Sequence, residues 1–553
     1  MGTRHGRILA TLAVASLMAG CGGGGGGGSS APPAANAPKP AGATVVIAPS
    51  GDLLHNDYTG AAFTLMARGT VTAANLAAGD LIYLRVRDPR GTLKAPPTQP
   101  VAPNQPFQVA LGTTSELTPG NYAGQIEYTA CRDASCNTPY GPPVTVNYAL
   151  NLATLGEWET IQRDGTHSGF VPTVIDTTRL NLAWQWRLPP PARVSDQPFI
   201  TRPATTTGGV HVLGGYTDSN GAQGEQALYS IGEFNGTTRW SYVVPPTAYA
   251  QAPTSSWSSG QVFLQLLNYQ DLLLSFDGDT GAPRFSVGPG AGIATRTLAP
   301  TSLGGLTFYY AGPNGSEVHA ISNTNSNTTA GTLRWKRTRT DVQPGTPSVQ
   351  QGQVFTQDGR TIEILDINTG APLGSIVDPS SDGATSPFMR SVTALGTRGN
   401  LLAVSYSGAT GAYPLSSFNI ENRRWEWSTT NSYRSFAVSD GVVFAYREGA
   451  TAPTLDAIDE ATGQVQWTWT PPATDAQLRT VGNVMLTRNL VFLSTEAANG
   501  TSFVWAIDRA SRQVVWRYPG GGYVIMSGSR TIYVLSGPGN GRPSDVLKAF
   551  RIK

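Results

Sequence analysis

The chain has 553 residues, and its 38 Lys and Arg residues nearly balance its 36 Asp and Glu residues. With no basic excess and no cluster of Lys or Arg interleaved with aromatics, the sequence excludes nucleic acid as a partner. Only 13% of the residues are charged, about half the usual share. Uncharged polar side chains must therefore cover much of the surface.

Residues 1–20 are typical of a bacterial export signal. Arg4 and Arg7 precede a short apolar run at 8–19, which is too short to cross a bilayer as a permanent helix. The run ends at Met18-Ala19-Gly20-Cys21, which resembles a lipoprotein cleavage site. The resemblance implies that Cys21 becomes the acylated first residue and anchors the protein in the membrane. An ordinary secretory signal with an incidental cysteine is the alternative.

Residues 21–43 are rich in Gly, Ser, Ala and Pro and include an unbroken glycine run at 22–28. This composition predicts a flexible tether between an anchor and a folded domain. By resemblance to enterobacterial lipoprotein sorting, Gly22 after the cysteine implies the outer membrane. Whether the protein faces the periplasm or the cell surface stays open.

Residues 44–152 predict an immunoglobulin-like (Ig-like) β-sandwich. Alternating apolar runs are separated by turn-rich stretches, with no helical period; the runs lie at 44–47, 81–86, 107–111, 122–128 and 144–152. The stretch at 117–122, Leu-Thr-Pro-Gly-Asn-Tyr, resembles the tyrosine corner of immunoglobulin-like and fibronectin-like folds. That resemblance implies a hydrogen bond from the Tyr122 hydroxyl back to the backbone. A chance Pro-Gly turn before a strand tyrosine is the alternative.

The other two of the three cysteines are Cys131 and Cys136. In an oxidising compartment this even pair predicts a disulfide at the tip of a hairpin. Closing so short a loop contributes only about 2 kcal/mol in the chain-entropy model. A metal site is disfavoured, because no histidine or third cysteine lies nearby in the sequence.

A ten-residue pattern recurs after residue 155, most clearly at 458–467 and 507–516. An apolar anchor is followed by Asp or Asn, then by a turn that commonly contains Gly, and then by an alternating run. The pattern predicts strand, turn, strand, with every second residue on one face. An aromatic closes most copies, at Trp240, Phe285, Trp335, Trp427, Trp467 and Trp516, and Gly374 stands where the aromatic is lost.

Successive pattern ends lie 39 to 53 residues apart, which suits a repeat of four short strands. The two ends of this region each hold half of a further copy. Residues 546–552 supply an anchor strand, and residues 182–186, ending in Trp186, supply its partner. Pairing them closes a ring and removes open strand edges. The predicted fold is therefore all-β, with an eight-bladed β-propeller at 155–553 after the sandwich.

The recurring aromatics are predicted to wedge between adjacent sheets. A large apolar ring can be buried there while an indole N–H finds a carbonyl. Stacking on a ligand is the alternative for any one of them.

The repeat resembles that of a known family. The pattern A-I-D-x-x-T-G-x-x-x-W, together with Trp158-Glu159-Thr160 and the stretch at 165–169, resembles the PQQ-like repeat β-propellers. This family includes quinoprotein dehydrogenases and the outer-membrane assembly lipoprotein BamB. The resemblance implies the fold, but it does not select a function, because the repeat serves packing in proteins with different activities.

Catalytic, cofactor and metal residues are not identifiable from the pattern. Asp164, His167 and Ser168 are close in sequence, but they match no nucleophile motif, and a core or loop role for His167 is favoured. The resemblance would place adjacent cysteines and a Ca²⁺ site in a PQQ enzyme, and the sequence has neither. PQQ is therefore not expected.

The prediction is an exported, lipid-anchored binding or scaffolding protein of the bacterial cell envelope. Its partners would be the membrane, through Cys21, and an envelope protein. A PQQ-dependent dehydrogenase or other quinoprotein-type enzyme, and a glycan-binding or glycan-active surface lipoprotein, are the alternatives.

Overall fold

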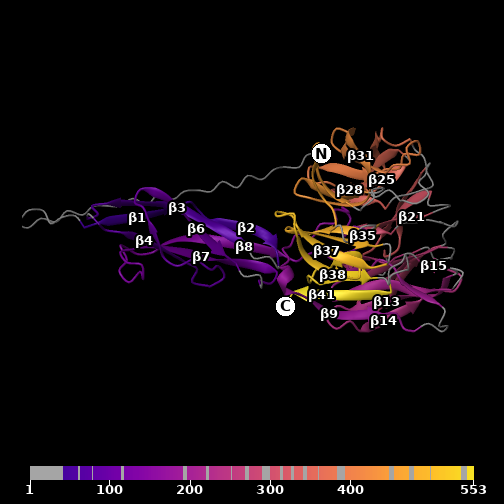
Figure 1. Ribbon diagram of the computed structural model, residues 1–553, viewed down its shortest axis with the longest axis horizontal. Coiled ribbons are helices and arrows are strands. Elements are labelled where there is room, and N and C mark those ends of the chain that lie inside the picture. The colour runs from indigo at the N-terminus through magenta and orange to yellow at the C-terminus, as the bar shows by residue number, and fades with distance from the viewer. Residues whose placement is uncertain are drawn as a thin grey trace, which may run out of the picture.

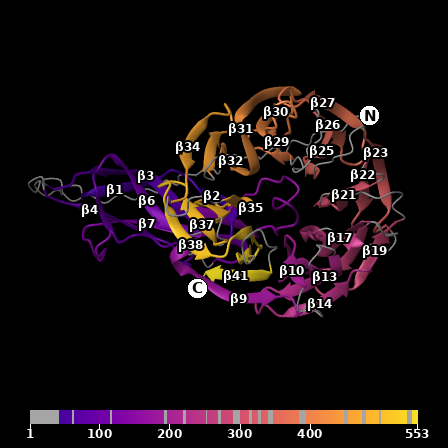
Figure 2. The same ribbon diagram turned by 45° about the vertical axis from the view of Figure 1, so that its right-hand side comes forward.

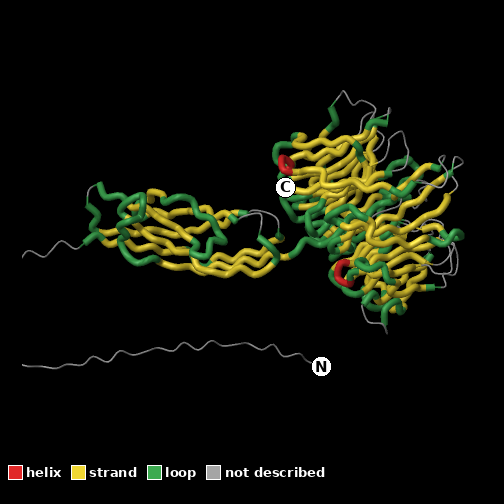
Figure 3. The backbone as a smooth tube through the Cα atoms, turned by 90° about the horizontal axis from the view of Figure 1, so that it is seen from below, coloured by secondary structure: helices red, strands yellow, loops and turns green. Residues whose placement is uncertain are grey.

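The computed structural model describes residues 42–552, except for 60–62, 78, 114–116, 191–195, 219–222, 251, 268–272, 289–298, 312–315, 325–328, 340–345, 359, 383–392, 448–453, 473–478, 498–499 and 537–544. The described chain is nearly all β, as predicted (Figure 3). Its helical segments are two single 3-10 turns, η1 (Thr177–Arg179) and η2 (Trp257–Ser259).

Residues 44–153 form an elongated unit of two sheets, which we call the arm (Figure 1). One sheet has the order β1-β3-β6 and the other β2-β8-β7-β4-β5. The bounds are β1 (Thr44–Pro49), β2 (Leu53–Tyr58), β3 (Thr64–Ala74), β4 (Ile82–Arg87), β5 (Gln99–Val101), β6 (Gln105–Gly112), β7 (Gly120–Cys131) and β8 (Val144–Ala153).

The arm has its own core. Alternate residues of both sheets point inward, as the period-two pattern predicts, and Val71, Val109 and Ile126 are fully buried between them. The Tyr122 hydroxyl donates to the carbonyl oxygen of Thr118 at 2.9 Å, so the bond expected of a tyrosine corner is present.

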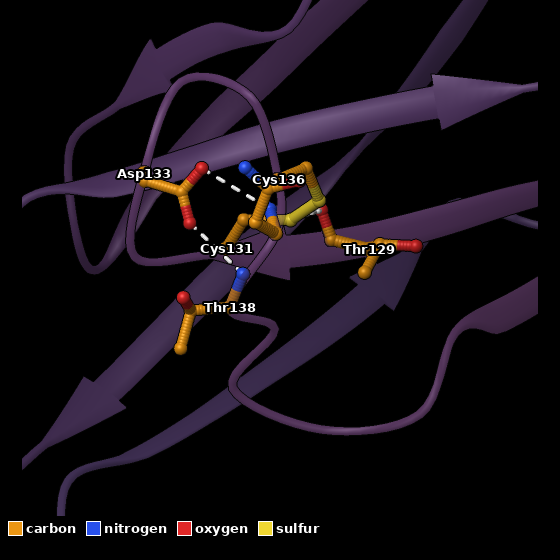
Figure 4. The surroundings of a disulfide bond; sticks show 6 residues. Thr129, Cys131, Asp133, Cys136 and Thr138 are labelled. Atoms are coloured by element: carbon orange, nitrogen blue, oxygen red, sulfur yellow. Dashed lines mark hydrogen bonds between the residues drawn. A yellow bond between two sulfur atoms is a disulfide. The ribbon is translucent and has the colours of Figure 1, made fainter.

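The predicted disulfide joins Cys131 to Cys136 at the end of β7, with their Cα atoms 5.0 Å apart (Figure 4). The Asp133 carboxylate accepts from the backbone N–H groups of Asn137 at 3.1 Å and Thr138 at 2.9 Å. The covalent bond and these hydrogen bonds together fix the hairpin tip.

The rest of the described chain forms a β-propeller, with its sheets arranged around a centre in chain order (Figure 2). The sheet orders are β10-β12-β13-β14 with β11 beside β12, β15-β17-β18-β19 with β16 beside β17, β20-β21-β22-β23, β24-β25-β26-β27, a seven-stranded sheet from β28 to β34, β35-β36-β37-β38, and β39-β40-β41-β9.

Bounds for the first half of the propeller are β9 (Leu180–Arg187), β10 (Gln197–Ile200), β11 (Ala204–Thr206), β12 (Gly209–Thr217), β13 (Gln223–Gly232), β14 (Thr238–Val243), β15 (Tyr249–Ala250), β16 (Thr254–Ser256), β17 (Gln261–Leu267), β18 (Leu273–Asp277), β19 (Pro283–Val287), β20 (Thr301–Leu303), β21 (Leu306–Ala311), β22 (Glu317–Ser322), β23 (Leu333–Thr338), β24 (Ser348–Gln350), β25 (Gln353–Asp358), β26 (Thr361–Asp366) and β27 (Pro372–Val377).

Bounds for the second half are β28 (Thr393–Leu395), β29 (Asn400–Val404), β30 (Pro414–Asn419), β31 (Arg424–Ser439), β32 (Val442–Arg447), β33 (Thr454–Asp459), β34 (Val465–Trp469), β35 (Arg479–Leu486), β36 (Leu490–Glu496), β37 (Ser502–Asp508), β38 (Val514–Pro519), β39 (Gly522–Met526), β40 (Ile532–Ser536) and β41 (Val546–Ile552).

One long strand explains the seven-stranded sheet. The first part of β31 pairs with β30, and its last residues pair with β32. A single 16-residue strand thus ends one four-stranded unit and begins the next.

The two ends of the propeller region meet in one sheet. β41 pairs with β40 on one side and with β9 on the other, with Leu547 opposite Trp186. The predicted pairing of the terminal half-copies is therefore confirmed.

Each copy of the repeat folds as strand, turn, strand. In the clearest copy the Asp459 carboxylate accepts from the Thr462 backbone N–H and hydroxyl, both at 2.9 Å, and Gly463 adopts a φ of 72°. The ladder then shifts register between Ala457 and Ile458. Equivalent shifts recur in every other copy, which makes the bulge part of the repeat.

Candidate functional site

The recurring aromatics all lie on the outermost strands of the propeller sheets, as the repeat predicts. Six of them are opposite the last residue before the register shift, for example Trp240 opposite Ser230 and Trp467 opposite Ala457. The bulge therefore sets the direction in which the ring points.

Several of these rings cover a glycine in the turn of the next sheet. A Cβ on Gly281 would lie 2.6 Å from the Trp240 ring, and one on Gly463 would lie 2.7 Å from the Trp427 ring. The indole N–H of Trp240 donates to the Gly278 carbonyl oxygen at 3.1 Å. The face of each ring that covers a glycine therefore connects two neighbouring sheets.

In the sheet that joins the two ends of the propeller region, the ring over the turn glycine belongs to Trp184 rather than to Trp186. The Trp184 ring lies 2.6 Å from a Cβ built on Gly236, and its N–H donates to the Glu233 carbonyl oxygen at 2.8 Å. Trp186 is two residues further along and donates to the Thr238 hydroxyl at 3.0 Å. The register between β41 and β9 shifts between Ala549 and Phe550. Trp184 is opposite Ala549, which is the last residue before that shift.

Arginine replaces the turn glycine in two copies. Arg512 has a φ of 63°, and its guanidinium carbon lies 5.6 Å from the centre of the Trp467 ring. Arg423 has a φ of 52°, and its side chain covers Gly374, where the aromatic is lost. In the first case the arginine covers a ring that elsewhere faces a glycine, and in the second it covers the glycine that stands where the ring is lost.

The axis of the propeller is the usual place for a ligand in this architecture, and here a segment of the chain itself occupies it. Residues 157–171, which we call the axial segment, run inside the ring (Figure 2). Innermost strands of successive sheets donate backbone N–H groups to its carbonyl oxygens at 2.7 to 2.8 Å. The pairs are Thr205 to Trp158, Ser255 to Glu159, Val349 to Gly165, Leu395 to Thr166, Val438 to Ser168 and Leu486 to Gly169.

Two glycines of the axial segment leave no room for a side chain. A Cβ on Gly165 would lie 2.5 Å from a Val349 methyl group, and one on Gly169 would lie 2.7 Å from the Ala437 Cβ. Trp158 and Val171 are also fully buried. The segment is therefore part of the core that joins the sheets.

Several polar side chains of the axial segment make hydrogen bonds within the protein. His167 is fully buried; its Nδ1 lies 2.9 Å from the Thr393 carbonyl oxygen, and its Nε2 lies 3.2 Å from the Thr301 hydroxyl. Burial lowers the pKa of His167 to about 4, so its ring is neutral at pH 7. Asp164 instead accepts from Thr166.

The structure does not bring Asp164, His167 and Ser168 together as a nucleophile set. Both His167 nitrogens have partners other than Ser168, whose hydroxyl oxygen accepts from the Phe170 N–H at 3.4 Å. Over the described ranges, no group of three or more His, Cys, Asp or Glu residues is placed to hold a metal ion. Cys21 lies outside the described residues.

Buried carboxylates at the third position of the repeat were missed by sequence reasoning. Glu460 is fully buried and accepts from the Thr397 N–H at 2.7 Å, in a turn of the preceding four-stranded unit. Glu233, at the same position in another copy, accepts from the Ser527 hydroxyl. The sequence offers one signal for these carboxylates: both glutamates stand two residues after the apolar anchor of their copy.

Comparisons with known proteins match a family model described as outer membrane protein assembly factor BamB to residues 184–469 of this chain. A search of curated proteins gives no match. BamB from Moraxella catarrhalis is similar in structure, with 16% identity and a TM-score of 0.43, over 67% of this chain and 99% of that one.

Two enzymes are also similar in structure. A quinohemoprotein alcohol dehydrogenase from Pseudomonas putida HK5 has 14% identity and a TM-score of 0.49, over 72% of this chain and 80% of that one. A europium-containing methanol dehydrogenase has 11% identity and a TM-score of 0.46, over 71% of this chain and 98% of that one. Within the described residues, no helix is both long and apolar enough to span a membrane.

Proposed function

The chain belongs to the family of the outer membrane protein assembly factor BamB, and from this premise we propose that it is a lipid-anchored scaffold of the bacterial cell envelope. The observation that carries the proposal is the axial segment. It runs inside the ring and bonds to the inner strands of most of the propeller sheets. The loops and outer strands are then the surfaces left for a partner, which we propose is a protein.

The proposal includes the organisation of the mature protein. Residues 1–20 form the signal, residues 21–43 the tether, residues 44–152 an Ig-like sandwich and residues 155–553 an eight-bladed propeller. The blade count is supported by the strand orders when β31 is counted in two blades and the β9–β41 sheet as one. The Ig-like assignment is supported by two sheets around one core and by the Tyr122 bond.

Anchoring is tested by replacing Cys21 with Ser. The acyl chains supply the anchoring energy, so the Cys21→Ser protein should move from the membrane pellet to the soluble periplasmic fraction. Ser29→Ala, in the same tether, is the matched control and should stay in the pellet. Fractionation with a high-salt wash, followed by immunoblotting, measures both. A Cys21→Ser protein that stays in the washed pellet would refute lipid anchoring.

The scaffold role is tested against the quinoprotein alternative on the full-length protein. Crosslinking in intact cells should capture envelope proteins. Adding PQQ and Ca²⁺ to purified protein should cause neither a melting shift nor dye-linked alcohol oxidation. A ligand of the folded state at a hundredfold excess over its Kd would stabilise it by about 2.7 kcal/mol, which is readily measured. A PQQ-dependent shift with turnover would replace the scaffold by a dehydrogenase.

A further inference from the structure

A pocket of about 320 Å³ lies at the junction of the arm and the propeller. Both units and the connection between them contribute to its walls. Its volume is at the lower end of the range for small-molecule sites, and such sites are common between domains. Five hydroxyl side chains line it, from Thr59, Thr118, Thr154, Thr207 and Ser529.

The two walls are held in place by a salt bridge between the units. The Arg488 guanidinium of the propeller donates to both carboxylate oxygens of Asp57, at the end of β2. Burial alone would raise the pKa of Asp57, but the hydrogen bonds and charge of Arg488 outweigh it and hold the pKa below its ordinary value. Only 5% of the Asp57 side chain is exposed, against 35% of the Arg488 side chain, and the pair joins the two walls of the pocket.

Arg530 is the one cationic residue in the pocket wall. It sits in a tight turn with a φ of 66°, where the Arg530 N–H donates to the Ser527 carbonyl oxygen at 3.0 Å. Its Nε is buried without a hydrogen-bond partner, and one terminal nitrogen makes only a long 3.5 Å contact to the Val174 carbonyl oxygen. No ion pair joins it to a carboxylate of the described chain.

Burial and the nearby charge of Arg179 lower the pKa of Arg530, so its charged form is poorly compensated within the protein. A guanidinium remains protonated in this situation. An anion would supply the missing acceptors through charge-assisted hydrogen bonds.

Glu157 is the one acidic residue in the wall, and it does not neutralise Arg530. It is only 3% exposed, and its carboxylate accepts from the Gly528 N–H at 3.0 Å. Burial raises the pKa of Glu157. The pocket therefore combines an unpaired cation with a set of neutral hydroxyl groups.

We propose that this pocket binds a small polyhydroxylated anion, of the chemical class of a sugar acid or a sugar phosphate. The oxyanion pairs with Arg530, and the ligand hydroxyls exchange hydrogen bonds with the threonine and serine side chains. Since the pocket has walls in both units, the bound ligand also bridges the arm to the propeller. This inference does not depend on the scaffold role.

Calorimetric titration and thermal melting of the full-length protein in detergent test the inference, with glucuronate, glucose 6-phosphate, glucose and inorganic phosphate as probes. At least one of the two anionic sugars should bind and raise the melting temperature. Glucose and inorganic phosphate should each bind at least about tenfold more weakly, because each lacks half of the recognised chemistry. The better of the two anionic sugars identifies the oxyanion.

Substitutions distinguish a loss of ligand binding at the pocket from a loss of stability of the whole protein. Arg530→Gln should weaken binding at least about tenfold while the melting temperature without ligand stays unchanged. Arg530→Lys should keep part of the affinity, Glu157→Gln should not weaken it, and Arg424→Gln, on an exposed outer strand, should have no effect. Binding that is equal in Arg530→Gln and the unaltered protein, equal affinity for glucose, or no binding of either anionic sugar would overturn the proposal.

Discussion

Deletion of residues 546–553 is expected to abolish cooperative folding of the propeller. The deletion removes β41, which is the shared partner of β40 and β9. Leu547 and Phe550 of β41 are buried at 0% and 1% exposure, and burying each such side chain stabilises a protein by roughly 1.5–3 kcal/mol. Adding the lost strand hydrogen bonds, we expect a loss above about 5 kcal/mol, which is comparable with the whole stability of a typical domain.

A deletion of equal length in the tether, residues 30–37, is the control. It should leave the melting transition unchanged, because that stretch is predicted to have no packed partner. Circular dichroism melting and light scattering would follow both proteins. We expect the C-terminal deletion to aggregate through the exposed edges of β9 and β40. A normal melting transition in that protein would mean that ring closure does not depend on β41.

Ring closure could be predicted because its signal is local. Residues 546–552 contain an anchor without a partner strand, and residues 182–186 contain the reverse, so the pairing follows from counting copies. The Asx turn at Asp459 and the alternation in β3 are also local patterns. Each half-copy, turn or alternating run is recognised from residues within about ten positions of one another, which a single sequence displays.

Features that depend on three-dimensional register could not be predicted in this way. Trp186 ends residues 182–186 and is predicted to be one of the recurring aromatics, yet the register shift between β41 and β9 places Trp184 over the next turn. The hydrogen bonds of the axial segment join it to strands up to several hundred residues away, and no periodicity marks them. His167 shows the same limit, since its partners Thr301 and Thr393 lie in distant parts of the chain.

Gly169→Ala is expected to destabilise the propeller by about 2–4 kcal/mol. Gly169 has a φ of 66°, which disfavours any Cβ, and the added methyl group would lie 2.7 Å from the Ala437 Cβ and 3.2 Å from the Val484 carbonyl oxygen. Relief of that overlap would require the axial segment to move away from β31 and β35. The hydrogen bond from the Leu486 N–H to the Gly169 carbonyl oxygen would then weaken as well.

The Gly208→Ala variant separates two contributions to the loss of stability, which are the cost of close packing and the cost of the backbone conformation. Gly208 has a φ of 74°, but a Cβ there meets no atom within 4 Å, so only the conformational cost of about 1 kcal/mol applies. Chemical denaturation of both variants measures the difference, which we attribute to close packing along the axis. Equal losses would mean that the axis has room beside the segment. The central channel would then again be a place for a small ligand, and the case for a protein-binding scaffold would lose its main support.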